Sequence, residues 1–159
     1  MRENEVKKGF NYALNVLSYR DRTEKEIRDK MTTKEYEKSV IDEVLLKLKK
    51  LNLINDVEFT EKYVEFRIER YGKNRLKQEL FRKGISKEII ENVLSYVGED
   101  EEFLAAKEIA IKKFNQYGDI PFEKKYNRLM GLLSRKGYSY STVKRVFEEL
   151  GIKRSNYYE

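Results

Sequence analysis

The sequence of 159 residues has no cysteine, no histidine and no tryptophan, and it has only one proline. Without cysteine and histidine there is no disulfide, no thiol nucleophile, no Cys/His zinc site, no Ser-His-Asp triad and no histidine acid–base chemistry. The lack of cysteine also fits a reducing compartment. No apolar run approaches the roughly 20 residues that cross a bilayer, and the polar residues Met1–Glu5 lack the apolar core of a signal peptide. These absences predict a soluble, cytoplasmic protein.

The sequence also offers little to cofactor or metal chemistry. It has neither the glycine-rich phosphate loop nor the glycine fingerprint of dinucleotide-binding proteins. Glu61, Glu65 and Glu69 have the spacing of one helix face, which a metal-dependent hydrolase could use. No second acidic cluster is evident and Lys62 and Arg70 flank the three carboxylates, so we interpret them as a solvated face. We therefore expect no catalytic residue, no metal and no cofactor.

The spacing of apolar residues predicts helices along most of the chain. Eight glycines and one proline leave long stretches that can be helical, and apolar residues recur at i, i+3, i+4 and i+7. No run alternates with the period of two that a half-buried strand requires. The two clearest helical faces are Val40, Ile41, Val44, Leu45, Leu48 and Leu51, and then Ile89, Ile90, Val93, Leu94 and Val97.

The apolar pattern repeats along the chain. The first part overlays the second at a shift of 49 residues, and a shift of 53 carries the second onto the third. That second shift also places Gly84–Ser86 on Gly137–Ser139, whereas Tyr71–Gly72 matches Tyr117–Gly118 at a shift of 46. The difference between these two shifts predicts a seven-residue insertion near 119–125.

These repeats predict three units of three helices each, at residues 8–55, 56–98 and 99–151. Because three short helices bury little surface by themselves, neighbouring units should stack and share a core. The predicted fold is all-α, an elongated tandem array of three three-helix repeats, and we expect a monomer. Each long face of such an array is then available to a partner.

Residues that start and end helices agree with this pattern. Thr23–Glu26 has the form of a capping box, and Asp56 and Ser86 can cap the helices that follow them. Pro121 suits a first helical turn, and the acidic run Glu99–Glu102 favours the start of a helix over an acidic docking patch. Five glycines follow helical patterns, where a left-handed residue commonly ends a helix: Gly84, Gly98, Gly118, Gly137 and Gly151.

Cations are concentrated in the second and third units. Residues 73–83 contain five Lys or Arg and one Glu, and Arg82–Lys83 aligns with Arg135–Lys136 at the shift of 53. A stacked array could hold such residues in a stripe that binds a phosphate backbone or an acidic protein groove. The alternative is a solvated helix surface with i, i+4 pairing to Glu. The candidate contact residues are Lys73, Arg75, Lys77, Arg82, Lys83, Lys124, Lys125, Arg128, Arg135 and Lys136.

Aromatic residues divide into two sets by their position in the pattern. One set has the spacing of an apolar helix face and is predicted to lie in the core: Tyr63, Phe66, Phe103, Phe114 and Phe147. The other set lies in turns or near the C-terminus: Tyr138, Tyr140, Tyr157 and Tyr158. These four tyrosines could stack on bases or anchor a protein contact, and packing at helix ends explains them equally well.

Three stretches of the sequence match the motifs of one protein family. Ser18–Ile27 resembles the opening R-x-x-S-x-x-E-L, with Thr23 in place of Ser. Leu53–Phe59 resembles the step L-[ILD]-D-x-x-F, with Asn55 where Asp is common. Tyr71–Ser86 closely matches the central signature G-x-x-R-I-x-x-E-L-x-x-K-G-I. On these motifs the chain resembles the RecX regulatory proteins over nearly its whole length.

The resemblance implies a non-catalytic modulator of the RecA recombinase, built from tandem three-helix repeats. RecX proteins bind the RecA nucleoprotein filament and suppress its ATP hydrolysis and strand exchange, which implies a role in DNA repair and the SOS response. Some members bind DNA weakly, and many carry an extra N-terminal segment before the repeats. The alternative function is a plain DNA-binding module that acts through the basic helical face, and a carboxylate-based hydrolase is a third hypothesis.

Overall fold

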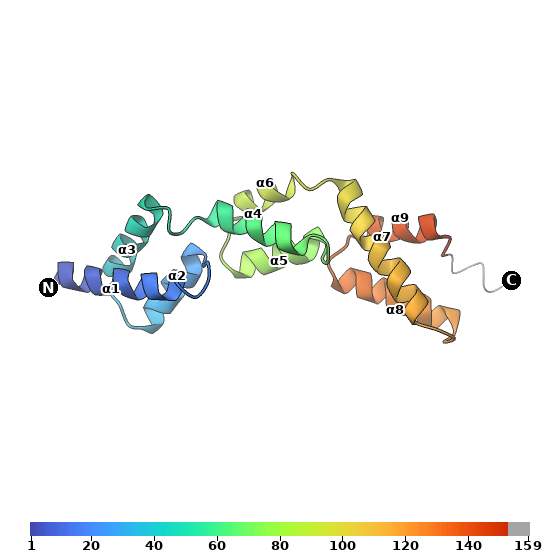
Figure 1. Ribbon diagram of the computed structural model, residues 1–159, viewed down its shortest axis with the longest axis horizontal. Coiled ribbons are helices and arrows are strands. Elements are labelled where there is room, and N and C mark those ends of the chain that lie inside the picture. The colour runs from blue at the N-terminus through green and yellow to red at the C-terminus, as the bar shows by residue number, and fades with distance from the viewer. Residues whose placement is uncertain (153–159) are drawn as a thin grey trace. The chain divides into compact units, whose positions relative to one another are not determined.

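A computed structural model describes residues 1–152 (Figure 1). Over this range the chain forms nine α-helices and no β-strand, which confirms the predicted all-α class. The helices are α1 (Arg2–Leu17), α2 (Glu24–Thr33), α3 (Lys38–Lys50), α4 (Asp56–Arg67), α5 (Lys73–Arg82), α6 (Lys87–Leu94), α7 (Glu99–Gln116), α8 (Phe122–Arg135) and α9 (Tyr140–Leu150). The repeat pattern in the sequence therefore corresponds to successive groups of three helices.

The helices belong to two compact units. The first contains Met1–Tyr63 and Leu80–Glu91, and the second contains Val64–Glu79 and the chain from Asn92 onward. The division runs through α4, α5 and α6, so the second group of three helices contributes residues to both units.

In the first unit, the core forms where α1 and α2 pack against α3. Met31 of α2 and Val44 of α3 are completely buried, and α1 approaches them through Gly9, where a Cβ atom would lie 3.0 Å from the Met31 side chain. Leu51, which the helical spacing placed on the apolar face of α3, is 55% exposed instead. That prediction is wrong because α3 ends at Lys50 and the chain turns there.

In the second unit, α7 packs against both α8 and α9. Leu129 and Leu133 of α8 are completely buried in this core, and the ring of Tyr126 meets that of Phe147 edge-on, with 5.0 Å between the ring centroids. Edge-on aromatic pairs of this kind add stability beyond the apolar area that they bury.

Several predicted helix caps are confirmed. Thr23 Oγ1 accepts a hydrogen bond from the Glu26 amide at 3.1 Å, and Glu26 Oε1 accepts one from the Thr23 amide at 3.0 Å, which completes the capping box. Ser86 Oγ accepts a hydrogen bond from the Ile89 amide at 3.3 Å at the start of α6. Four of the five predicted glycines have a positive φ: Gly84, Gly118, Gly137 and Gly151.

Two predicted caps are wrong. Asp56 does not cap α4, because the preceding residue does so: Asn55 Oδ1 accepts a hydrogen bond from the Glu58 amide at 3.1 Å. Gly98 does not end a helix in a left-handed conformation. Its φ is −71° and it stands at the N-cap position of α7, whose first turn is the acidic run Glu99–Glu102.

The aromatic predictions are largely confirmed, with one clear error. Phe103 and Phe147 are buried and Tyr63 and Phe114 are half-buried, whereas Phe66 is 83% exposed. On α4 the buried residues are Thr60, Val64 and, just beyond the helix, Ile68. Phe66 lies two residues from both Val64 and Ile68 and therefore faces the other way.

The four turn and C-terminal tyrosines have separate outcomes. Tyr138 is 3% exposed and belongs to the core of the second unit, which settles its position in favour of packing, and Tyr140 is 74% exposed. Tyr157 and Tyr158 lie outside the described residues.

Candidate functional site

Two of the predicted contact lysines lie where one three-helix group meets the next. In the first unit, the turn Lys83–Gly84 at the end of α5 lies against the start of α2. Thr23 Oγ1 donates a hydrogen bond to the Lys83 carbonyl at 2.6 Å, and Lys83 Nζ lies 3.8 Å from Glu26 Oε2. Gly84 has a φ of +87°, and a Cβ atom there would overlap the side chain of Lys25. The turn therefore needs glycine for its conformation and for the close approach.

Glu26 is the electrostatic centre of this first junction. Burial disfavours its charged form, but the Arg20 guanidinium at 2.9 Å, the Thr23 amide and the Lys83 ammonium group outweigh that effect. The pKa of the Glu26 carboxyl is consequently lowered from its usual value. Lys83 thus has a structural partner on the protein itself.

The same arrangement recurs in the second unit at the turn Lys136–Gly137. The Gly72 amide donates a hydrogen bond to the Lys136 carbonyl at 2.7 Å, and the Asn74 amide donates one to the Gly137 carbonyl at 3.1 Å. Gly137 has a φ of +97°, and a Cβ atom there would overlap the backbone of Arg75. The alignment of Lys83 with Lys136 at the shift of 53 therefore reflects a shared junction, which explains part of the recurrence of cations.

At each junction, the first helix of the later three-helix group also places a carboxylate against the earlier group. Asp56 Oδ1 accepts a hydrogen bond from the Glu24 amide at 3.0 Å, at the start of α2. Glu102 Oε2 accepts one from the Lys73 amide at 3.2 Å, at the start of α5, and Glu102 is only 6% exposed. A negative charge at these positions satisfies free amide groups and complements the helix dipole. Neither residue was predicted from the sequence to have this role.

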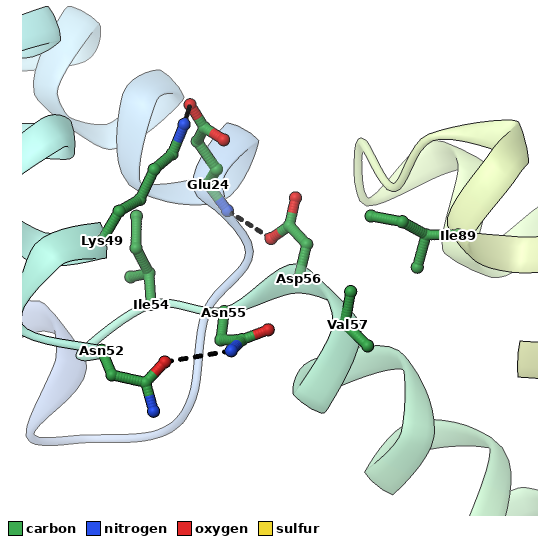
Figure 2. A pocket seen from close by; sticks show the side chains of 8 residues that line it. All are labelled: Glu24, Lys49, Asn52, Ile54, Asn55, Asp56, Val57 and Ile89. Carbon is green, nitrogen blue, oxygen red and sulfur yellow. Dashed lines mark hydrogen bonds and ion pairs between the residues drawn. The ribbon is translucent and has the colours of Figure 1, made fainter.

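Figure 2 shows the pocket around Asp56 in the first unit. Lys49 Nζ lies 2.8 Å from a carboxylate oxygen of Glu24, and the Asn55 amide group donates a hydrogen bond to Asn52 Oδ1 at 3.0 Å. Burial raises the pKa of the Asp56 carboxyl, against the lowering effect of the Glu24 amide. The polar groups that face this pocket are paired with one another, which is the chemistry of a structural joint between helices.

Five of the ten predicted contact residues are engaged with the protein. Lys73 Nζ donates a hydrogen bond to the Val97 carbonyl at 2.7 Å. The guanidinium group of Arg75 lies 4.2 Å from the centroid of the Tyr71 ring, and its Nε lies 2.9 Å from Glu79 Oε1. The remaining members of this engaged set are Lys83, Lys125 and Lys136, which lie over the rings of Tyr63, Phe114 and Tyr71 respectively.

Tyr71 is a further residue whose role the sequence did not reveal. Three cations surround its ring: Arg67 at 4.5 Å, Arg75 at 4.2 Å and Lys136 at 4.8 Å from the ring centroid. Glu79 Oε1 accepts hydrogen bonds from both arginines, at 3.0 and 2.9 Å. This cluster joins α4, α5 and the turn after α8. In the sequence, the pair Tyr71–Gly72 indicated only the alignment of the repeats.

The other five candidates are exposed and make no ion pair within residues 1–152. We call them the free cations, and they are Lys77, Arg82, Lys124, Arg128 and Arg135. Because an exposed cation without a partner gives up only water when it meets an anion, these residues are suited to contact a partner.

The carboxylates Glu61, Glu65 and Glu69 face solvent, as we interpreted from the sequence. All three are exposed, and Glu69 lies beyond the end of α4 at Arg67. Within residues 1–152 no group of three potential ligands is placed to hold a metal ion, and no helix there is long and apolar enough to cross a membrane.

Comparison with known proteins identifies the family. Three family models match in order along the chain: the first three-helix domain of RecX at residues 10–48, the second at 55–94 and the third at 99–147. The fold is thus that of an all-α protein with three three-helix domains in tandem. The chain belongs to the RecX family of regulatory proteins, as the motif resemblance indicated.

Individual relatives agree with this assignment. The regulatory protein RecX of Clostridioides difficile is 35% identical over 145 residues, which are 90% of this chain and 68% of that protein. The RecX of Listeria welshimeri is 36% identical over 87% of this chain and 52% of its own length. The crystal structure of RecX from Lactobacillus salivarius superposes with a TM-score of 0.85 at 32% identity, covering 95% of this chain and 99% of that one.

Proposed function

We propose that this protein binds the RecA nucleoprotein filament and inhibits its ATPase, recombinase and strand-exchange activities, thereby modulating DNA repair and the SOS response. Membership of the RecX family is the observation that carries this proposal. In this role the protein acts in the cytoplasm as a monomer, without catalysis, metal or cofactor. Its relatives are named regulatory proteins, which agrees with a function through binding.

The free cations are the proposed contacts with the filament, either with acidic protein surface or with the bound DNA. The engaged cations are less suited to this task, since a partner would first have to break an internal contact such as that of Lys73 with Val97 or Arg75 with Glu79. Substitution of an engaged residue would also change folding stability, which would confuse any binding measurement. Tests of function should therefore use free cations.

The decisive variant is Arg82→Glu combined with Arg135→Glu. Both residues are exposed and lack ion pairs within the described chain, so helicity measured by circular dichroism should be unchanged. We expect inhibition of the DNA-dependent ATPase of RecA to be abolished, because two attractive contacts become repulsive. The matched control is Lys112→Glu with Lys144→Glu, which changes the net charge equally at two other exposed cations on α7 and α9. Full inhibition by the Arg82/Arg135 variant would refute the proposed contact surface.

A second candidate function is a DNA-binding module that acts through the basic helical face without RecA. The observation that favours it is the set of three free cations on α8: Lys124, Arg128 and Arg135. This function predicts tight binding to naked DNA that weakens steeply as salt rises, because each neutralised phosphate releases counterions. Negligible binding at physiological salt, together with inhibition of RecA, would leave the protein partner as the target.

A further inference from the structure

The free cations of α8 lie on one side of the helix with a glycine among them. Lys124, Arg128, Gly131 and Arg135 follow one another at spacings of 4, 3 and 4 residues, which at 3.6 residues per turn brings all four to one side. The opposite side of α8 contains the fully buried Leu129 and Leu133. We call the four residues the α8 stripe, and it faces solvent.

Within residues 1–152, no contact accounts for a glycine at position 131. Glycine in a helix interior is less stable than alanine, and Gly131 is not among the glycines with positive φ. A Cβ atom there would meet only the guanidinium group of Arg135, the mobile end of a long side chain, with its Nη1 at 2.9 Å. At Gly72 and Gly137, by contrast, a Cβ atom would overlap backbone atoms. Gly131 is thus a gap in an otherwise covered surface.

The corresponding side of α5 is built differently, although the two helices align at a shift of 53. Arg128 aligns with Arg75, which is paired with Glu79. The position of Glu79 is taken in α8 by Leu132, so the acid that neutralises the arginine on α5 is missing from α8. Gly131 aligns with Gln78. The combination of free cations and a gap therefore belongs to α8.

We propose that the α8 stripe binds the phosphate backbone of a nucleic acid, and that Gly131 allows the backbone to approach the helix closely. This inference rests on the basic helical face proposed in the preceding subsection, and it assigns the contact with nucleic acid to α8. The stripe extends over about 16 Å of helix axis, from Lys124 to Arg135. That length corresponds to several phosphates along one strand, at about 3.4 Å per nucleotide.

The chemistry of the stripe favours a nucleic acid over an acidic protein. Protein interfaces are centred on buried aromatic or aliphatic anchors, with charges at the rim. No apolar side chain of α8 is exposed, since the exposed residues beside the stripe are Glu123, Asn127 and Ser134. Contacts to phosphate need only cations, polar groups and close access. Phosphate accordingly matches the stripe better than a protein surface does.

The sharpest test is Gly131→Ala, examined with fluorescently labelled 30-nucleotide single-stranded and 30-base-pair double-stranded DNA in the absence of RecA. Alanine favours the helix, so the melting temperature should rise by about 1–4 °C. Binding should nevertheless weaken about fivefold, because the added methyl group holds the phosphate backbone farther from the cations of the stripe. Loss of helix stability cannot explain weaker binding in a variant whose melting temperature rises. Unchanged affinity in the variant, or no binding by the wild-type protein at low salt, would overturn the proposal.

A second measurement tests the two arginines of the stripe. In Arg128→Ala/Arg135→Ala, the slope of log affinity against log salt should become shallower by about 1.8 for duplex DNA and 1.4 for single strands, for two phosphate contacts. The control Lys112→Ala/Lys144→Ala removes the same net charge from α7 and α9 and should change the slope much less. Equal changes in both variants would mean that net charge alone is responsible, and the proposal would be wrong.

The result is separable from the RecA proposal. If Gly131→Ala weakens DNA binding yet inhibits RecA fully, the α8 inference stands and the filament contact lies elsewhere. If the wild-type protein fails to inhibit RecA while the α8 variants lose DNA affinity as expected, only the proposed regulatory function fails.

Discussion

The junction between α5 and the turn after α8 can be tested with a single methyl group. Replacing Gly137 with alanine introduces a Cβ atom that would overlap the backbone of Arg75, at a residue whose φ is +97°. Two independent penalties therefore act in one variant: a left-handed conformation imposed on an L-residue, and displacement of the backbone hydrogen bonds that Gly72 and Asn74 make across the junction.

Other glycines in the same unit allow the two penalties to be separated. Gly118 has a φ of +66°, but no atom lies within 4 Å of an added Cβ, so Gly118→Ala should cost only the left-handed conformation, about 1–2 kcal/mol. Gly137→Ala adds overpacking of about 1–3 kcal/mol, for a total of about 2–5 kcal/mol. Gly98→Ala has neither penalty, since Gly98 has a φ of −71° and open space around it, and it serves as the baseline.

The free energy of unfolding of the three variants is measured by urea titration, followed by circular dichroism at 222 nm. The expected order of stability is Gly98→Ala, then Gly118→Ala, then Gly137→Ala. If Gly137→Ala and Gly118→Ala lower the free energy of unfolding equally, the close approach at the junction does not exist in solution. The interpretation of Lys136 as a structural residue would then lose its basis.

Two further predictions concern the core and the first junction. Leu80→Ala should lower the free energy of unfolding by about 2–5 kcal/mol because Leu80 is completely buried. The control Phe81→Ala, at a neighbouring residue that is 70% exposed, should change the free energy of unfolding little. A negligible effect of Leu80→Ala would mean that the inner face of α5 is wrongly assigned. The pKa of the Glu26 carboxyl is lower in the folded protein than its ordinary value of about 4.5. The ionised carboxylate therefore stabilises the fold at pH values above about 4.5, and this stabilisation is lost as the pH falls through the lower folded pKa. Glu26→Gln should remove this part of the acid dependence in unfolding titrations, and an unchanged pH profile would contradict the pairing with Arg20 and Lys83.

The comparison of the two junctions changes how repeated cations should be interpreted. Lys83 and Lys136 recur because each ends a helix just before a glycine that contacts the preceding three-helix group. Arg82 and Arg135 recur beside them and have no such partner within residues 1–152. A residue that recurs in a repeat protein can therefore be required for stacking or be available to a partner. The contacts that its side chain and backbone make within the protein distinguish the two cases.

The sequence by itself determined the helices, the threefold repetition and most of the caps. These features depend on interactions between residues three or four apart, such as the capping box of Thr23 and Glu26, and such spacings are visible in one dimension. The family assignment followed from the same short motifs. Errors arose where a local pattern continued past the end of a helix, as at Leu51.

Only the tertiary structure decided which cations are free and why the junction glycines are required. The contact of Thr23 with Lys83 joins residues 60 positions apart, and the proximity of Gly137 to Arg75 is of the same kind. The charge of a lysine is evident from its sequence, but its availability depends on which distant acid, carbonyl or ring lies beside it after folding. The sequence therefore predicted a basic face of ten residues, and packing left five of them free to meet a partner.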